Sequence, residues 1–231
     1  MKKINKLILS TSILFVVFVI YTLLIKYLDV RAIGPNSSKV GFGWINKLVK
    51  DKSNIGFVAE GYHLALYNIT DWGGILCVPV GFIFLVIGIV EWIKRKNIFK
   101  VDHNILALGI FYVLTGLTYL FFQFVVINYR PVLIKYGSDL QLESSYPSSH
   151  TMLALTVLLT AIDGINIYIK NNKVRIPLIV LCIILSTTFV VLRFISGVHW
   201  FTDIVGGIIM SFTLISTYML TKEILNIKLT K

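Results

Sequence analysis

Apolar residues occur in six long runs along the chain, separated by segments in which polar and charged residues gather. The runs cover about residues 7–27, 73–93, 104–126, 151–169, 176–195 and 204–221. Each approaches or exceeds the roughly 20 residues that a helix needs to cross a bilayer. None alternates like a strand of a membrane β-barrel, and a helix satisfies its own backbone hydrogen bonds. The pattern predicts an all-α, polytopic membrane protein, a bundle of six transmembrane helices.

The first apolar run follows Met1-Lys2-Lys3 and has some features of a secretory signal peptide. The run is longer than the roughly 7–15 apolar residues of such a signal, and no small-x-small cleavage site follows it. An uncleaved first span is therefore expected. No repeat or low-complexity linker divides the chain, so residues 1–231 are expected to form a single membrane-embedded domain.

The longest polar segment, residues 28–72, contains a short helical pattern. Phe42, Ile45, Leu48 and Val49 recur at helical spacing, and lysines occupy the other faces. This arrangement predicts a short amphipathic helix that lies in the membrane interface. Such a helix could guide a lipid headgroup, although packing over the end of the bundle is the simpler interpretation.

Composition agrees with a lipid environment, because only 14% of the residues are charged, against roughly 25% in soluble domains. The net charge is +11. Thirteen basic residues precede the first span or follow the second, fourth and sixth: Lys2, Lys3, Lys6, Lys94, Arg95, Lys96, Lys100, Lys170, Lys173, Arg175, Lys222, Lys228 and Lys231. The positive-inside rule then predicts cytoplasmic termini, with these clusters near anionic headgroups. No basic patch interleaved with aromatic residues is present, so no nucleic-acid partner is expected.

Cysteine and tryptophan positions need no functional explanation. Cys77 and Cys182 fall within spans and lack the spacing of a disulfide framework or a metal site, so buried free thiols are expected. Trp72, Trp92 and Trp200 lie at predicted span ends, where an interfacial aromatic belt accounts for them.

Polar residues in the second half of the chain converge on one membrane face. Arg130 follows the third span, His150 opens the fourth, and the connection between the fifth and sixth contains Arg193, His199 and Asp203. The fourth and fifth spans form a hairpin, so its two open ends return to the same face. With both termini in the cytoplasm, this is the outer face.

His199 and Asp203 could form an activated nucleophile, in which a carboxylate supports a histidine. Their spacing of four places them on one face of a helix. A carboxylate bonded to one ring nitrogen fixes the tautomer and leaves the other nitrogen free to attack. An isolated pair of this kind is more often a polar helix end. Here two arginines and a second histidine share the face, which favours the catalytic interpretation.

Arg130 and Arg193 are candidates for a phosphate clamp. Guanidinium groups match phosphate oxygens in a bidentate manner and offset the charge that develops during phosphoryl transfer. Either arginine could instead extend toward lipid headgroups. For Arg193 the clamp is favoured, because polar residues at membrane depth are usually functional.

The segment Pro-Ser-Ser-His at 147–150 completes the candidate site. A loop that enters a helix offers free backbone N–H groups to an anion, and Ser148 and Ser149 add hydroxyl donors. His150 can protonate the departing oxygen as a general acid. The alternative is a serine-capped helix start with His150 at the interface; capping and phosphate binding are compatible.

Together these residues resemble the type 2 phosphatidic acid phosphatase superfamily, whose motifs are Lys-x6-Arg-Pro, Pro-Ser-Gly-His and Ser-Arg-x5-His-x3-Asp. Residues 123–131, 147–150 and 192–203 keep the spacing of these motifs. The resemblance implies a hydrolase without metal or cofactor that forms a phosphohistidine on His199. Asp203 would support this nucleophile, and His150 would act first as acid and then as base. The phosphate would be held by Arg130, Arg193 and Ser148.

The resemblance also implies a lipid phosphate as substrate, namely undecaprenyl diphosphate, phosphatidylglycerophosphate or phosphatidic acid, at the outer face of the cell membrane. Three positions depart from the motifs: Gln123 replaces lysine, Ser149 replaces glycine and Leu192 replaces serine. Gln123 can still donate a hydrogen bond to phosphate, but a weaker one than a charged group. Lys135 could supply the missing charge. Retained activity is expected; the alternative is a catalytically quiet relative that binds or moves phospholipids.

Overall fold

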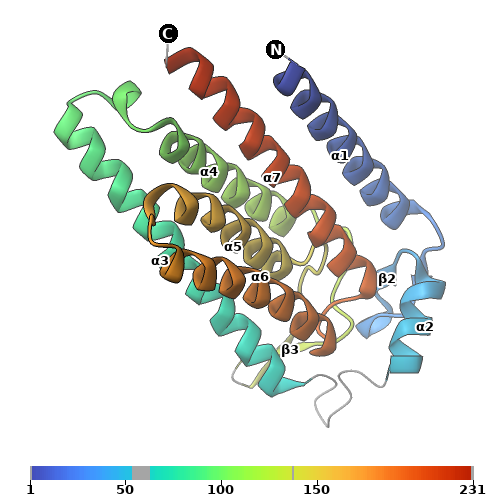
Figure 1. Ribbon diagram of the computed structural model, residues 1–231. Coiled ribbons are helices and arrows are strands. Elements are labelled where there is room, and N and C mark those ends of the chain that lie inside the picture. Colours follow the sequence, from blue (N-terminus) through green and yellow to red (C-terminus); the bar gives the residue numbers. More distant parts are fainter. Residues whose placement is uncertain (1, 54–62, 137, 230–231) are drawn as a thin grey trace.

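The computed structural model describes residues 2–53, 63–136 and 138–229, apart from the side chains of residues 52, 53, 136 and 229. Its long helices lie side by side in a bundle (Figure 1): α1 (Lys2–Tyr27), α3 (Leu64–Arg95), α4 (His103–Phe124), α5 (Ser149–Tyr168), α6 (Asn172–Ile195) and α7 (Phe201–Leu229). Within the described ranges, these six helices are long and apolar enough to span a membrane. The six-helix prediction is confirmed. Lys231, one of the basic residues counted above, lies outside the described residues.

Helix α3 starts at Leu64 rather than near residue 73. The polar residues Asn68, Thr70 and Asp71 lower the hydropathy of its first two turns. These turns were therefore predicted to belong to the loop 28–72. In the structure the Thr70 hydroxyl donates to the carbonyl of Leu66 at 3.0 Å, so this polar group is satisfied within the helix. The early start places two additional turns of α3 beside the candidate site.

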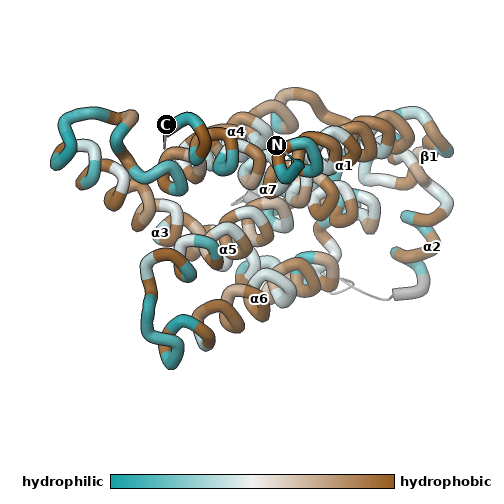
Figure 2. Tube along the Cα trace, turned by 45° about the horizontal axis from the view of Figure 1, so that its top comes forward, coloured by the Kyte–Doolittle hydropathy of each residue, from teal (hydrophilic) through white to brown (hydrophobic). Residues whose placement is uncertain are grey.

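Helices α5 and α7 form the centre of the bundle. In each of them 56% of the most apolar window is buried, against 11% in α1 and α6. Helix α5 contacts α3, α4, α6 and α7, whereas α1 packs mainly on α7. A hydrogen bond of 2.7 Å between the hydroxyls of Thr11 and Ser216 joins α1 to α7. The outward faces of the helices are hydrophobic along most of their length (Figure 2), as expected for contact with lipid.

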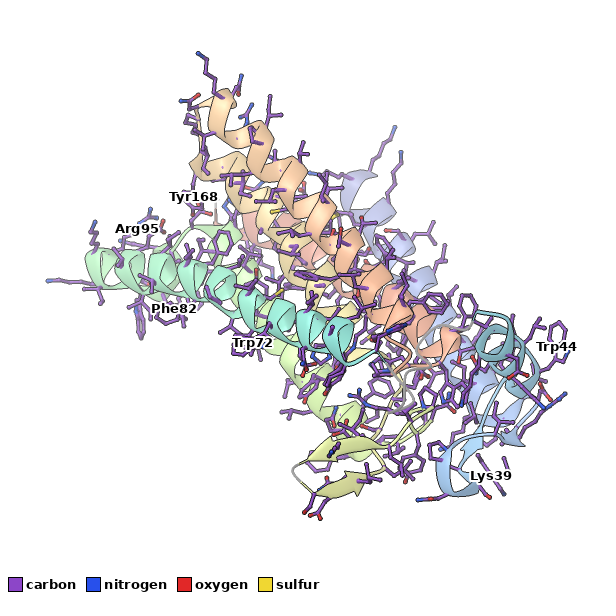
Figure 3. All side chains as sticks on the ribbon, turned by 90° about the horizontal axis from the view of Figure 1, so that it is seen from below. Lys39, Trp44, Trp72, Phe82, Arg95 and Tyr168 are labelled. Carbon is purple, nitrogen blue, oxygen red and sulfur yellow. The ribbon has the colours of Figure 1, made fainter. Side chains whose placement is uncertain are left out.

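Both chain ends lie at one end of the bundle (Figure 1). The opposite end carries α2 (Gly43–Ser53), the turn η1 (Pro35–Ser37) and two hairpins, β1 (Arg31–Ala32) with β2 (Lys39–Val40) and β3 (Ile134–Tyr136) with β4 (Asp139–Gln141). Figure 3 shows Arg95 and Tyr168 at the end opposite Lys39 and Trp44. The turn η2 (Ile98–Lys100) connects α3 to α4.

Helix α2 confirms the short amphipathic helix predicted around residues 42–49. A polar side chain of this helix is buried: Asn46 donates to the carbonyl of Gly41 and to the hydroxyl of Thr202, both at 2.9 Å. These bonds attach α2 to the first turn of α7. The two small hairpins were not predicted, because strands of two or three residues leave no periodic pattern.

The segment before α5 is clamped against α7. Tyr146 is buried, and its hydroxyl lies 2.8 Å from that of Thr22 on α1. A Cβ atom on Gly206 would lie only 2.2 Å from the Tyr146 ring. The absence of a side chain at Gly206 therefore allows this close approach, which sets the position of the residues that follow.

One aromatic residue departs from the interfacial belt. Trp72 and Trp92 are exposed, as the belt predicts, but Trp200 is only 2% exposed. Its indole Nε1 donates to the carbonyl of Tyr129 at 2.8 Å. The belt prediction was wrong for Trp200, because the turn before α7 folds over the bundle and brings the indole inside. Cys77 and Cys182 are both unpaired, as predicted.

Candidate active site

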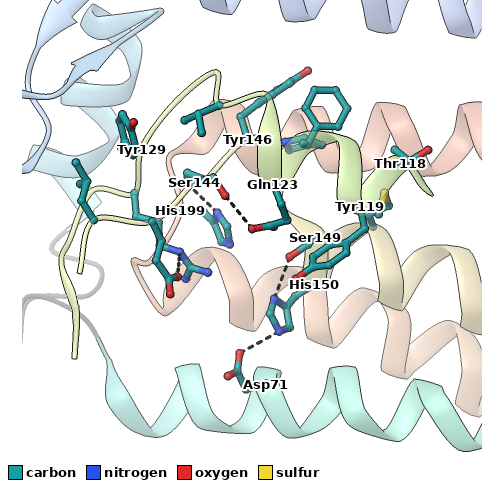
Figure 4. A pocket seen from close by; sticks show the side chains of 18 of the residues that line it. Asp71, Thr118, Tyr119, Gln123, Tyr129, Ser144, Tyr146, Ser149, His150 and His199 are labelled. Atoms are coloured by element: carbon teal, nitrogen blue, oxygen red, sulfur yellow. Dashed lines mark hydrogen bonds and ion pairs between the residues drawn. The ribbon is translucent and has the colours of Figure 1, made fainter. Parts of the chain in front are cut away.

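A cavity of about 420 Å³ opens at the end of the bundle that carries α2. Its walls come from α3, α4, α5, the segment between α4 and α5, and the turn before α7 (Figure 4). Among the residues that line it are Gln123, Arg130, Ser149, His150 and His199. The cavity thus brings together residues that are up to 132 positions apart in the chain, from Tyr67 to His199.

His199 lies in the turn between α6 and α7, two residues before α7 begins. Its Nδ1 lies 2.9 Å from the hydroxyl oxygen of Ser145, and its buried Nε2 has no hydrogen-bond partner among the described residues. Burial, followed by the positive charges of Arg130 and Arg193, holds the pKa of His199 well below its ordinary value of 6.5. The ring is therefore neutral at pH 7 and has one uncommitted nitrogen, as a nitrogen nucleophile requires.

Asp203 does not bond to His199 directly, contrary to the expectation from their spacing. Its carboxylate accepts hydrogen bonds from Ser145 Oγ at 2.5 Å, Trp200 N at 3.0 Å and Asn128 Nδ2 at 3.2 Å. The bond from Trp200 N caps the first turn of α7, as an acidic residue at the third helical position often does. Because His199 precedes the helix and Asp203 turns back to cap it, Ser145 lies between the two side chains.

Arg193 is fully buried near the end of α6. Its Nη1 donates to the hydroxyl of Thr70 at 3.0 Å and to Asp71 Oδ1 at 3.1 Å, and its guanidinium lies over the ring of Tyr67 at 5.0 Å. Within the described part of the chain, its Nε and Nη2 have no hydrogen-bond partner. Complete burial shows that Arg193 does not extend to lipid headgroups, and two of its donor atoms remain uncommitted.

Arg130 is also buried, with 7% of its surface exposed. Its Nε lies 3.0 Å from Glu143 Oε2, and its backbone N–H donates to the carbonyl of Glu143 at 3.0 Å. Its Nη1 has no hydrogen-bond partner among the described residues. Buried polar atoms without a partner are costly, and native proteins contain few of them. Their presence on Arg130, Arg193 and His199 together makes this cavity the candidate site for an anion.

His150 lies in the first turn of α5 and faces both α3 and its own helix start (Figure 4). Its Nε2 lies 3.0 Å from Asp71 Oδ1, and its Nδ1 lies 3.5 Å from the hydroxyl of Ser149. Asp71 was missed at the sequence level because it was assigned to the long outer loop. A carboxylate directly before an apolar run, on the face that gathers the other polar residues, was the available signal.

The sequence model of the PAP2 superfamily matches residues 80–225. The chain belongs to the PAP2 superfamily. A similar solved structure is the crystal structure of the first transmembrane PAP2-type phosphatidylglycerophosphate phosphatase from Bacillus subtilis, with a TM-score of 0.58 and 18% identity over 93% of this chain and 94% of that one. This similarity shows a shared fold. No curated protein gives a significant match.

Two wall residues of this PAP2 chain, Tyr67 and Asp71, precede the matched region, which begins at residue 80. Asp71 pairs with Arg193, and Glu143 pairs with Arg130. Each of the two guanidinium charges is therefore offset by a carboxylate. What the described site offers to an anion is therefore uncommitted N–H donors more than net positive charge.

The remaining candidates occupy different positions relative to the cavity. Ser148 is buried and absent from the described cavity wall: its backbone N–H donates to the Asp203 carbonyl at 3.0 Å, and its hydroxyl caps α5 at 3.5 Å from Thr151 N. Gln123 lines the cavity and accepts a hydrogen bond of 3.2 Å from Ser144. Lys135 lies exposed on β3, outside the described wall, so it does not replace the charge that Gln123 lacks.

Metal-ligating residues do not cluster at this site. In the described ranges, no group of three or more His, Cys, Asp or Glu side chains is arranged to hold an ion. The polar groups that face the cavity are guanidinium, imidazole, hydroxyl and amide groups with two flanking carboxylates. They are suited to holding an oxyanion through N–H and O–H donors.

Proposed function

We propose that this protein is a membrane lipid phosphatase that transfers a phosphoryl group from a lipid to His199 and then to water. The observation that supports this most is the set of buried, uncommitted nitrogen atoms on His199, Arg130 and Arg193. A phosphate group that enters the cavity can accept hydrogen bonds from both guanidiniums while its phosphorus faces the imidazole. Membership of the PAP2 superfamily agrees with this function.

In the first step, the lone pair on His199 Nε2 attacks phosphorus and forms the N–P bond as the P–O bond to the lipid breaks. His150 donates a proton to the departing oxygen, so the lipid leaves as an alcohol, or as a monophosphate if the substrate is a diphosphate. Arg130 and Arg193 stabilise the charge on the non-bridging oxygens during this transfer. The product is a phosphohistidine.

In the second step, His150, now neutral, accepts a proton from water as the water oxygen attacks phosphorus. The N–P bond breaks, inorganic phosphate leaves, and the lone pair returns to His199 Nε2. No oxidant, reductant or cofactor enters this balance. The two guanidiniums supply the N–H donors that hold the non-bridging oxygens during transfer, so we propose that turnover is independent of metal ions.

The proposed substrates are lipid phosphates of the outer leaflet of the cell membrane: undecaprenyl diphosphate, phosphatidylglycerophosphate or phosphatidic acid. The Bacillus subtilis structure with the same fold is described as a phosphatidylglycerophosphate phosphatase. The cavity is lined by the starts of α3 and α5 and the end of α4. These helix ends lie opposite the two chain termini (Figure 1). Basic residues that follow α3 and α5 lie at the end of the termini, which supports cytoplasmic termini and an outer active site.

The test is phosphate release by purified full-length protein in lipid nanodiscs with each of the three lipids. Release from at least one, with a ³²P label on histidine that is lost in acid and kept in alkali, supports the proposal. Release without any such label would overturn the phosphohistidine step. A His199→Ala protein of equal folding stability is the matched control and should give neither signal.

The second candidate is a catalytically quiet PAP2 protein that binds or moves phospholipids. Gln123 and the pairing of both arginines with carboxylates favour it, because they reduce the positive charge available to phosphate. Folded protein that releases no phosphate from any of the three lipids, yet binds one of them, would replace the first proposal with the second.

A further inference from the structure

Ser145 lies between the proposed nucleophile and the carboxylate that supports it. Its hydroxyl oxygen is 2.9 Å from His199 Nδ1 and 2.5 Å from Asp203 Oδ2. The serine is only 2% exposed. Because no direct hydrogen bond joins the ring to the carboxylate, the hydrogen-bonded connection between Asp203 and the imidazole runs through this hydroxyl.

The hydrogen atoms in this chain of three residues can be assigned from donor and acceptor counts. Asp203 accepts three hydrogen bonds in all, which stabilise its ionised form. An ionised carboxylate only accepts, so the single hydroxyl hydrogen of Ser145 is donated to Asp203. The oxygen of Ser145 must then accept from His199, which places the ring hydrogen on Nδ1.

The lone pair of the neutral ring is then on Nε2, the buried atom that has no partner among the described residues. We propose that Ser145 is a positioning residue that couples Asp203 to His199 and holds the imidazole in the tautomer that attacks phosphorus. This inference rests on the proposed function, because it assigns Ser145 a role in presenting the His199 nucleophile.

The coupling also acts during phosphoryl transfer. When Nε2 forms its bond to phosphorus, the ring becomes positively charged while its Nδ1–H stays hydrogen-bonded to Ser145. The Ser145 dipole, aligned by the negative charge of Asp203, stabilises this cation. No proton has to leave the ring, so the step balances with the nucleophile, the substrate and the general acid alone.

The surrounding structure holds Ser145 in place from several sides. Its backbone N–H donates to the carbonyl of Asn128 at 2.9 Å, while the side chain of Asn128 donates to Asp203. Gly41 N in turn donates to Asn128 Oδ1 at 3.3 Å, which links the first outer loop to this network. The next residue, Tyr146, is packed on Gly206. Rigid support of this kind is what a positioning hydrogen bond needs.

The experiment compares Ser145→Ala, Ser145→Thr, Asp203→Asn and the double variant Ser145→Ala/Asp203→Asn in the full-length protein. Ser145→Ala should lower kcat by roughly 10²-fold, the scale of losing a proton-handling or preorganised donor group, with a smaller change in KM. The double variant should be no slower than the slower single variant, because residues that act as a unit are not additive. Ser145→Thr, which keeps the hydroxyl, should recover part of the rate.

The matched control is Ser211→Ala. Ser211 is also a fully buried serine, but its hydroxyl donates to the carbonyl of Gly207 within α7 at 2.6 Å, away from the cavity wall. Its loss should leave kcat within about threefold of wild type, as expected for a hydroxyl outside an active site. A Ser145→Ala protein as active as this control, or single losses that multiply in the double variant, would overturn the role of Ser145.

Nitrogen NMR of ¹⁵N-histidine-labelled protein gives a readout that does not require turnover. Wild-type His199 should carry its hydrogen on Nδ1, and Ser145→Ala should shift the population toward Nε2–H. A wild-type His199 ring with its hydrogen on Nε2 would disprove this inference even if the enzyme is active. Conversely, the protein could show the expected tautomer but release no phosphate. That result would disprove the proposed function and leave the hydrogen-bond assignment intact.

Discussion

The Nε2 atom of His150 lies 3.0 Å from Oδ1 of Asp71. The same carboxylate oxygen accepts a hydrogen bond from Arg193 at 3.1 Å. A residue on α3 therefore connects the proposed general acid with one half of the proposed phosphate clamp. Its negative charge favours the protonated imidazole, the form that can donate a proton to a leaving oxygen.

Replacement of Asp71 should affect the protonation step selectively. In Asp71→Asn, kcat for a lipid phosphate is expected to fall roughly tenfold, because an alkoxide leaving group needs the proton that His150 provides. With p-nitrophenyl phosphate, whose leaving group needs little protonation, the loss should be much smaller. The ratio of the two kcat losses is the measurement. Equal losses on both substrates would contradict the link between Asp71 and His150.

Replacing His199 should reduce turnover more than replacing His150. His199→Ala removes the attacking nitrogen and should abolish turnover, whereas His150→Ala should slow turnover by roughly 10²–10⁴-fold, the usual contribution of a general acid. Initial rates of phosphate release measure both. His103→Ala, at the opposite end of the bundle, is the control and should stay near wild type. Wild-type activity in His199→Ala would disprove the assignment of the nucleophile.

Activity should persist below the ordinary pKa of histidine. Burial and the nearby arginines lower the pKa of His199, so the ring loses its nucleophilic lone pair only when the pH falls below 6.5. After burial, the charge of Arg130 is the next largest cause of the lowered pKa of His199. Arg130→Gln removes this charge, so the pKa of His199 should rise and the acidic limb of the pH–rate profile should move to higher pH. Normalised kcat/KM profiles with one substrate test this. A limb that stays in place, or moves to lower pH, would argue against it.

Restoring a positive charge at position 123 should tighten phosphate binding. Gln123 lines the cavity, and charged hydrogen bonds are roughly twice as strong as neutral ones. Gln123→Lys should therefore lower KM for the preferred lipid several-fold, on the order of 1 kcal/mol in binding. Gln141→Lys adds the same charge on exposed β4 and serves as the control. If both variants change KM equally, long-range charge rather than contact at residue 123 is responsible.

Chelation and vanadate test the chemical class of the reaction. Because guanidinium and imidazole groups supply the charge in the proposed steps, saturating EDTA should leave the rate within about twofold of the untreated enzyme. Vanadate should inhibit competitively, since its five-coordinate form resembles phosphorus during transfer and binds at the same nitrogen. Loss of activity in EDTA that Mg²⁺ restores would contradict metal independence, and insensitivity to vanadate would contradict a histidine nucleophile.

Much of the fold could be predicted from sequence because lipid imposes a simple rule. A segment that crosses hydrocarbon must be apolar, helical and about 20 residues long, so α4, α5 and α6 were located to within about four residues. Helix ends outside hydrocarbon obey no such rule. The polar first turns of α3 and the last turns of α7 were therefore missed.

Hairpin topology alone was enough to place His150, Arg130 and His199 on one membrane face, because two consecutive spans return the chain to the side where it started. The spacing of residues could not show how the side chains meet. Asp203 turns back to cap α7 instead of contacting His199, a choice that depends on where the helix starts. The position of Trp200 at a predicted span end suggested the lipid interface, but the turn before α7 buries this residue.

From its sequence alone, this chain could be recognised as a six-span membrane protein with the residue types of a phosphoryl-transfer site. Only the tertiary structure decided which partners complete that site. Asp71 reaches His150 and Arg193 from α3, and Ser145 fills the space between His199 and Asp203. The physical reason is that the length and apolar character of a span are set by the hydrocarbon it must cross. Hydrogen bonds depend on atoms within about 3 Å, and packing between distant segments brings those atoms together.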